Sequence, residues 1–480
     1  MSRRCRPGWV NSKIRPCHEG KSRDRLIPEV PMKVVILGAE VRGFQIAKHL
    51  IEERKNVVLI EPDPKKAAFA ASKLDCLVIN GSGNDLSVLK QAGVGDADIF
   101  ISMTDSDEVN MVACGLVSSE FNVGTKIASI RNLNYIGSEG LSGKILGIDY
   151  IVNPEAEVAR AIHESIDKGA FSDVITFQKT DLQLHNIKIS ADSRLADKHV
   201  RTIRRYMRKY DFLITAISRD QEVFIPTGDT LIKGGDTLSL ITEQKGMAKV
   251  FRALGIRKTK IRKVLLVGGS KTARFLLRHF TAQERKHFAL VEADSETCKE
   301  FQARYPEILI IKSDITDEVL YEDEDIASYD LIVTLTDNDE LNILTAIFAK
   351  RIGVARGIAL VKHNNNYLRL TPHLDIDSTF AMSHSTVNSV LRYIRGGRYA
   401  SAYSILDGKI EVVELPLEDE SPVAGKKIKD IRLKGKALIA AVTRKGKNMI
   451  PTGETELAAG DVLLITADRM AFEDVMKIFT

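Results

Sequence analysis

The sequence repeats itself at a nearly constant offset. The segment "TDSDEVN" at residues 104–110 returns as "TDNDELN" at 336–342. The longer segment "AISRDQEVFIPTGDTLIKGGD" at 216–236 returns as "AVTRKGKNMIPTGETELAAGD" at 441–461, and the offsets stay between 225 and 232 residues. Several ordered matches at one offset do not arise by chance. The 480 residues are therefore two copies of one unit, and any fold must account for both.

Each copy divides into two parts with different patterns. The first part alternates helical patterns with short, continuous apolar runs, which are "VVIL", "NVVLI", "CLVI", "DIFISM" and "KIASI" in copy one and "VLLV", "FALV", "ILII", "DLIVTL" and "IALV" in copy two. Continuous apolar strands separated by helices predict a doubly wound, Rossmann-like parallel sheet that is covered on both faces. The second part has alternating strands around an "IPTG" turn, which predicts a small α+β module.

The chain is therefore predicted to be α/β, with two doubly wound domains, each followed by a small α+β module. We place a basic tail at 1–31, and the other four boundaries follow from the repeat: a doubly wound domain at 32–150, a linker helix and module at 151–250, a second doubly wound domain at 260–380, and a second linker helix and module at 381–480. The linker stretch "PEAEVARAIHESIDKG" has the pattern of a helix, which fits a hinge or a contact between copies of the chain.

The excess positive charge lies in the first 31 residues. The chain carries 69 Lys and Arg against 64 Asp and Glu, and the two signs balance from Met32 onward. We therefore expect no nucleic-acid-binding face. The tail lacks the apolar segment of a signal peptide, and we interpret it as a disordered arm or a mis-assigned start before Met32, with a membrane-surface arm as the alternative. No apolar run approaches the roughly 18 residues that span a bilayer, so any membrane role is expected to go through a partner.

The first doubly wound domain carries a glycine loop, "GAEVRG", between its first strand and first helix. The second strand ends in Glu61, which follows Gly38 at the spacing expected of a carboxylate that holds a ribose hydroxyl. The loop after the third strand contains Ser82, and the fourth strand ends in Thr104 and Asp105. Ligands of such sheets bind outside the carboxyl ends of the strands. The predicted loop residues are Gly38, Ala39, Glu40, Val41, Arg42 and Gly43.

The second doubly wound domain repeats this plan. The loop is followed by Glu292 and then by Thr336 and Asp337, and it consists of Gly268, Gly269, Ser270, Lys271, Thr272 and Ala273. Each feature alone has a structural explanation, since a glycine can simply form a turn, a Thr or Asp can cap a helix, and an acid can end a solvated strand. Their recurrence in the same order in both copies favours a nucleotide site in each domain.

Glu40 stands where a dinucleotide loop has its middle glycine, which lets the backbone approach a pyrophosphate. A carboxylate there adds bulk and like charge, and the repulsion at about 4 Å amounts to about 4 kcal/mol before screening. Arg42 is expected to offset part of it. We therefore expect the first site to bind a dinucleotide weakly, to bind another adenine nucleotide, or to have lost binding. Ser270 and Lys271 add no negative charge, so the second site is the better candidate for a dinucleotide.

Together these features resemble the TrkA family of cytoplasmic regulatory subunits of bacterial Trk potassium uptake, which are built from two RCK (KTN) nucleotide-binding domains and two TrkA-C domains. The resemblance covers residues 32–480 and rests on the tandem order, on "TDxDExN" after the fourth strand and on "IPTGxTxxxxGD". It implies regulatory binding of NAD(H) or ATP/ADP and assembly into a homotetrameric ring. It also implies docking beneath a TrkH- or TrkG-like potassium-translocating protein, at the inner face of the cell membrane.

The family's motifs can be carried onto this chain residue by residue. Its glycine loop falls on 38–43 and 268–273, its ribose-binding acid on Glu61 and Glu292, and its fourth-strand contact on the two Thr-Asp pairs. At the end of the fifth strand of the first domain the family often has Arg-x-Arg, where this chain has Ser129 and Arg131. One phosphate-facing arginine is therefore absent, and this departure adds to the effect expected of Glu40.

The alternative function is an NAD-dependent dehydrogenase. Such an enzyme needs a proton-transfer residue near the nicotinamide. The α+β modules carry no concentrated set of His, Lys and Asp, and His163, His363 and His384 each occur in only one copy. The five cysteines form no C-x-x-C pair and have no nearby His at ligand spacing, which favours free thiols and no metal site. We therefore expect a regulator without catalytic residues.

Overall fold

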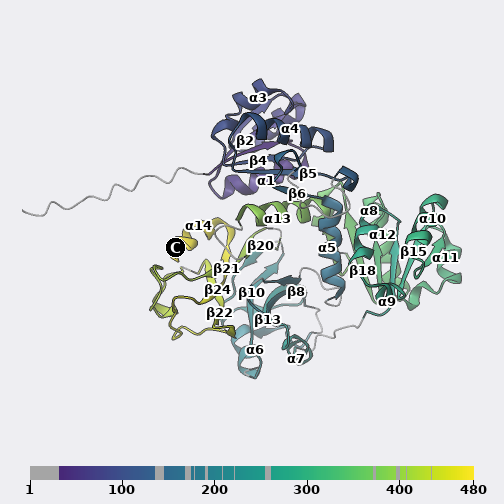
Figure 1. The fold of residues 1–480 in the computed structure, drawn as a ribbon. Coiled ribbons are helices and arrows are strands. Elements are labelled where there is room, and N and C mark those ends of the chain that lie inside the picture. The colour runs from purple at the N-terminus through teal and green to yellow at the C-terminus, as the bar shows by residue number, and fades with distance from the viewer. Residues whose placement is uncertain are drawn as a thin grey trace, which may run out of the picture.

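The computed structural model describes residues 32–135, 145–167, 174–177, 179–189, 193–207, 209–220, 222–254, 261–370, 374–395, 401–406, 408–433 and 435–479. The tail at 1–31, expected to be disordered, lies outside the described residues. Figure 1 shows two α/β domains and two smaller modules. We call the α/β domains N1 (32–152) and N2 (261–381), and the modules C1 (174–254) and C2 (401–479).

N1 contains a parallel sheet of six strands in the order β3-β2-β1-β4-β5-β6, as predicted for a doubly wound fold. The central strands are buried along their length because helices cover both faces. Helices α1 (Val41–Glu52) and α2 (Pro64–Lys73) cover one face, and α3 (Leu86–Gln91) and α4 (Asp107–Glu120) cover the other. The strands are β1 (Lys33–Leu37), β2 (Asn56–Glu61), β3 (Leu77–Asn80), β4 (Ile99–Ser102), β5 (Thr125–Ser129) and β6 (Tyr150–Val152).

N2 repeats this architecture with the strand order β16-β15-β14-β17-β18-β19. Its strands are β14 (Val264–Val267), β15 (Phe288–Glu292), β16 (Leu309–Lys312), β17 (Leu331–Thr334), β18 (Arg356–Val361) and β19 (Ser378–Ala381). Its helices are α8 (Lys271–Arg278), α9 (Ala282–Arg285), α10 (Ser295–Arg304), α11 (Glu318–Asp323) and α12 (Asp339–Ile352). All ten predicted apolar runs form strands, and each sheet gains a sixth strand that was not predicted.

C1 and C2 each contain a five-stranded antiparallel sheet, and the two sheets face each other across a shared apolar core. The predicted α+β modules are thereby confirmed. C1 consists of β7 (Val174–Thr176), β8 (Leu182–Lys188), β9 (Lys198–His199), α6 (Val200–Tyr206), β10 (Phe212–Arg219), β11 (Glu222–Phe224), β12 (Leu231–Ile232), β13 (Thr237–Glu243) and α7 (Met247–Ala253). C2 consists of β20 (Ser401–Ile405), β21 (Ile410–Pro416), β22 (Ala437–Arg444), β23 (Lys447–Met449), β24 (Val462–Asp468) and α14 (Phe472–Met476).

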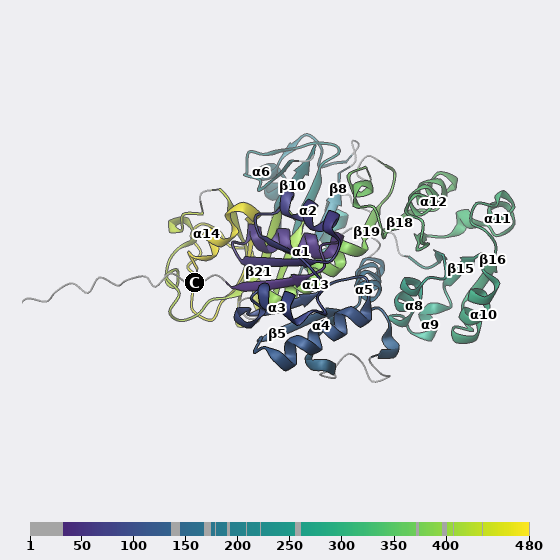
Figure 2. The ribbon, with the colours of Figure 1, turned by 90° about the horizontal axis from the view of Figure 1, so that it is seen from above.

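The two linker helices exchange partners. Helix α5 (Pro154–Asp167) follows N1, but its Val158 and Ile162 are buried in the core of N2. Helix α13 (Met382–Arg395) follows N2, but its Val387 and Val390 are buried in the core of N1. Figures 1 and 2 show α13 against α1 and α5 beside α8. The linker helix that was expected to act as a hinge or as a contact between copies is therefore a core element of the opposite domain. Among the described helices, none is both long and apolar enough to span a bilayer.

Candidate functional site

The glycine loop of N1 lies at the carboxyl edge of the sheet, between β1 and α1, where the strand order changes direction. Gly38 has a φ of +101°, which L side chains rarely adopt, and a Cβ there would lie 3.0 Å from the carbonyl oxygen of Met103. A Cβ at Gly43 would overlap the carbonyl oxygen of Gly38. Glycine at both positions therefore lets strand, loop and helix pack closely, as a phosphate-binding loop requires.

The glycine loop of N2 has the same turn but a different helix start. Gly268 has a φ of +95°, and a Cβ at Gly269 would overlap the Thr297 side chain. The hydroxyl of Ser270 accepts a hydrogen bond from the amide of Ala273 at 3.4 Å and so caps α8. Glu40, at the equivalent position of N1, makes no side-chain cap to α1. The side chain at this position therefore caps the helix in N2 only.

The acids that end β2 and β15 hold the two glycine loops. Glu61 is only 3% exposed, and its carboxylate accepts hydrogen bonds from the amides of Ala39 at 2.6 Å and Asp63 at 2.9 Å. Glu292 accepts the equivalent bonds from Gly269 at 2.6 Å and Asp294 at 2.8 Å. The explanation of Glu61 as a solvated strand end is wrong, because its side chain is buried. Both acids instead connect the loop to the turn after the second strand.

Asn110 of α4 joins the ends of β4 and β5 in N1. Its side-chain oxygen accepts hydrogen bonds from the amide of Thr104 at 2.9 Å, the hydroxyl of Thr104 at 2.8 Å and the hydroxyl of Ser102 at 2.9 Å. Its side-chain nitrogen donates to the carbonyl oxygens of Thr104 at 3.0 Å and Ser129 at 2.8 Å. Asn110 is not among the predicted site residues, although it is the last residue of the repeated "TDxDExN". Thr104 is thus fixed in position at the sheet edge.

The same motif supplies the helix caps and a clamp on the fifth strand. Ser106 caps α4 and Asn338 caps α12, so the suggestion that Thr104 or Asp105 caps the helix is wrong. The carboxylate of Asp107 accepts hydrogen bonds from the amides that follow β5, at residues 131 and 132, and Asp339 does the same after β18. The repeated acids and amides therefore hold the edge of each sheet together.

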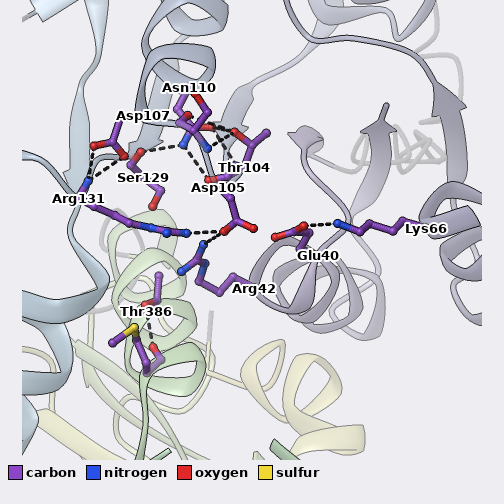
Figure 3. A network of polar contacts seen from close by, with 12 residues as sticks. Glu40, Arg42, Lys66, Thr104, Asp105, Asp107, Asn110, Ser129, Arg131 and Thr386 are labelled. Atoms are coloured by element: carbon purple, nitrogen blue, oxygen red, sulfur yellow. Dashed lines mark hydrogen bonds and ion pairs between the residues drawn. The ribbon is translucent and has the colours of Figure 1, made fainter. Parts of the chain in front are cut away.

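Five charged side chains form a network at the edge of N1, shown in Figure 3: Glu40, Arg42, Lys66, Asp105 and Arg131. Arg42 donates to one oxygen of Asp105 at 2.9 Å, and Arg131 donates to the same oxygen. Lys66 of α2 pairs with Glu40. The hydrogen-bonded partner of Glu40 is therefore Lys66. Arg42 interacts with Glu40 only through their opposite charges, and its expected offset of the repulsion stays a prediction. Position 129, where the family often has an arginine, is a serine in this chain. Arg42 nevertheless places a second guanidinium beside Arg131.

The carboxylates of Glu40 and Asp105 lie next to each other in this network (Figure 3). The side-chain interaction with Asp105 raises the pKa of Glu40, and partial burial raises it further, whereas the pairing with Lys66 opposes the shift. The interaction with Glu40 lowers the pKa of Asp105, and the two guanidiniums lower it further. Burial lowers the pKa of Arg42, and the positive charge of Arg131 adds to this effect. Glu40 is therefore the carboxyl of the pair that takes up a proton first as the pH falls.

The edge of N2 carries fewer charges among its described residues. Asp337 pairs with Lys362 at 2.5 Å, and this bond lowers the pKa of Asp337. The side chain of Asp337 is 91% exposed, whereas that of Lys362 is 8% exposed. Asn342 fixes Thr336 as Asn110 fixes Thr104 in N1.

Three further predicted residues differ in their exposure. Lys271 is exposed at the start of α8, whereas the side chain of Thr272 is fully buried. Ser82 is exposed on the loop after β3. The structure therefore brings the predicted residues to one edge of each sheet, with Thr272 beneath that edge. Among the described residues, no group of three or more His, Cys, Asp or Glu side chains could hold a metal ion.

Comparisons with known proteins point in one direction. The TrkA-N domain family matches residues 34–154 and 264–380, and the TrkA-C domain family matches residues 184–255 and 412–480. The Trk system potassium uptake protein TrkA of Halomonas elongata is 30% identical over 93% of this chain and 98% of its own length. The Trk system potassium uptake protein TrkA homolog 1 of Methanosarcina mazei is 29% identical over 93% of this chain and 100% of its own length.

Two solved structures share the fold of the whole chain. The crystal structure of the GsuK RCK domain aligns with a TM-score of 0.56 at 18% identity, over 94% of this chain and 96% of that one. The GsuK channel bound to NAD aligns with a TM-score of 0.55 at 19% identity, over 95% of this chain and 79% of that one. These alignments extend over nearly the whole of this chain.

Proposed function

Because this chain belongs to the TrkA family of Trk system potassium uptake proteins, we propose that it is a nucleotide-binding regulatory subunit of a Trk-type potassium transporter. The relatives match over nearly their whole length, which supports carrying over the role as well as the fold. We propose that the subunit acts from the cytoplasm on a separate TrkH- or TrkG-like membrane protein, and that it is peripheral to the inner face of the membrane.

The observation that carries this proposal is the loop at the edge of each doubly wound sheet. Both loops have the positive φ and close packing of a phosphate-binding turn, and an acid holds each of them from the second strand. The NAD seen in the GsuK channel supports a nucleotide as the ligand. We propose NAD(H) or ATP/ADP as the regulatory ligands.

Helix α1 offers a route from the first site to C2. Its N-terminus begins at the glycine loop, and Glu52 at its C-terminus pairs with Arg469 of C2 at 2.8 Å. A ligand shifts a conformational equilibrium only by its different affinity for the two states. Any displacement of the loop by a nucleotide would move both ends of this single helix and hence the C2 contact. We propose that such shifts act in a closed ring of four copies.

We propose binding without turnover. The polar groups at both edges hold the loops and the strand ends, as Glu61, Asp107 and Asn110 do in N1. A dehydrogenase would instead need a group poised for proton transfer at the nicotinamide. The modules that would have to supply a substrate site pack their sheets against each other.

Titration of the full-length protein with NADH, NAD, ATP and ADP by calorimetry tests the proposal, alongside hydride-transfer assays with common hydroxy acids. We expect binding of at least one nucleotide and no turnover. In cells that need this subunit for potassium uptake, Gly38→Asp combined with Gly268→Asp should abolish the potassium uptake that depends on the subunit. Turnover of a hydroxy acid, or uptake that is unaffected by the double substitution, would contradict the proposed function.

A further inference from the structure

We propose that Asp105 takes the place of a ligand phosphate between Arg42 and Arg131, so that a nucleotide enters the N1 site by displacing this carboxylate. The inference rests on the proposed function, because the displacing ligand is a nucleotide. It adds the chemical class that the first site selects, which is a ligand with at least one phosphate. It also assigns Asp105 the role of a competitor for the cations rather than that of a ligand contact.

The geometry at Asp105 leaves the two arginines only partly engaged. Both guanidiniums donate to a single carboxylate oxygen, whereas each carries five N–H donors and commonly binds an anion through two of them. The side chain of Arg42 is only 13% exposed, so water does not fully solvate its charge. A phosphate, with several oxygens and up to two negative charges, can accept paired hydrogen bonds from both guanidiniums. It therefore satisfies these two cations better than one carboxylate does.

Asp105 lies where such an exchange requires little rearrangement. Its side chain is 56% exposed and covers the more buried guanidiniums from the solvent side. The backbone around it is fixed, because Asn110 holds Thr104 and Ser106 caps α4. Only the Asp105 side chain needs to turn outward, and no core residue has to move. Figure 3 shows this carboxylate between the two arginines on one side and Glu40 on the other.

N2 provides an internal comparison. Asp337 occupies the equivalent position, but it is almost fully exposed and its partner is the ammonium of Lys362. An ammonium is a point charge without the fork of a guanidinium, so it holds a carboxylate with less directional preference. Displacement of Asp337 should therefore have little effect on the nucleotide affinity of N2. We infer that the two sites are unequal, and that N1 fills at higher ligand concentration than N2.

Calorimetry on the full-length protein tests the inference with ADP and with adenosine, which lacks the phosphates. N2 is silenced by Glu292→Ala, which removes the acceptor for the Gly269 amide. In this background Asp105→Asn keeps the side-chain shape and removes its charge. We expect the ADP affinity of N1 to rise about tenfold, as the loss of one nearby like charge predicts. The affinity for adenosine should change less than twofold.

Two matched variants sharpen the test. Asp337→Asn, with N1 silenced by Glu61→Ala, should raise the ADP affinity of N2 less than threefold. The gain in ADP affinity of Asp105→Asn should disappear when it is combined with Arg42→Ala, because only one of the two guanidiniums is then left to bind the phosphate. Weaker ADP binding by Asp105→Asn would overturn the inference, since Asp105 would then be a ligand contact. An equal gain for ADP and adenosine would also overturn it, because it would point to a loosened loop. Absence of nucleotide binding at both wild-type sites would instead refute the proposed function.

Discussion

Replacement of Glu40 by glycine restores the residue that a dinucleotide loop has at this position, and it should strengthen nucleotide binding at N1. The substitution removes a carboxylate that lies beside Asp105 and is paired with Lys66. It should not disturb the fold, because Glu40 precedes α1 without capping it and glycine is tolerated at this position. Loss of the partly exposed pair with Lys66 should cost about 0–1 kcal/mol of stability.

The size of the effect follows from the charges around the loop. A carboxylate about 5 Å from a phosphate repels it by about 3 kcal/mol at a surface-like dielectric. Lys66 cancels part of this repulsion in the wild type, and in the variant its ammonium becomes available to the phosphate. A net gain of about 1.4 kcal/mol corresponds to an affinity increase of about tenfold. We expect this gain for ADP and NADH in the background in which Glu292→Ala silences N2.

The reverse substitution in the second copy is the matched control. Ser270→Glu places a carboxylate at the equivalent position of N2 and removes the cap of α8, so the affinity of N2 should fall. The wild-type N1 site should also bind ADP more tightly as the pH is lowered toward the raised pKa of Glu40, because protonation removes its charge. The ADP affinity of the Glu40→Gly variant should depend less on pH than that of the wild type. An affinity change below twofold, together with an unchanged pH dependence, would refute this reasoning.

Three further predictions concern stability. Asn110→Ala leaves buried donors without an acceptor and should destabilise N1 by about 2–4 kcal/mol in chemical denaturation. Gly43→Ala places a Cβ against the loop carbonyl and should cost about 1–3 kcal/mol and weaken N1 binding, whereas Ala273→Gly at the equivalent position should cost no more than about 1 kcal/mol. Partial burial and the stacked ring of His163 at 5.0 Å lower the pKa of His279, so its contribution to stability is present above about pH 6.5 and is lost as the pH falls. Thermal melts between pH 7.5 and 5.5 should show a smaller decrease for His279→Gln than for the wild type.

The repeated apolar runs were sufficient to predict the two doubly wound sheets, because continuous apolar runs between helical patterns are typical of strands that helices cover on both faces. The edge strands β3 and β16 are partly exposed, but they follow the same pattern in the sequence. The sixth strands were missed since β6 and β19 have only three and four residues and no pattern of their own. The exchange of α5 and α13 could not be predicted either. A helical pattern indicates which face is apolar but not which of two similar sheets that face will cover.

At the candidate site the residue types were visible in the sequence, but their partners were not. The glycine loop and Glu61 follow from local spacing, and the structure brings them together as expected. Lys66 stands in no motif and reaches Glu40 only because α2 packs beside the loop. Arg42 was expected to offset part of the charge of Glu40, whereas the carboxylate to which it donates belongs to Asp105, 63 positions later in the chain. Ion pairs between distant segments require the fold before they can be predicted.

The exchange of linker helices also bears on how such a chain can be cut or can have arisen. A protein ending after C1 would expose the apolar face of α5 and leave the N1 sheet without the cover of α13. Two such half-length proteins would restore every buried surface by pairing, each lending its helix to the other. The chain therefore has the organisation of a helix-swapped homodimer within one polypeptide. Because the two halves are parts of one polypeptide, their glycine loops can differ, as Glu40 and Ser270 do, whereas a homodimer would carry the same residue in both loops.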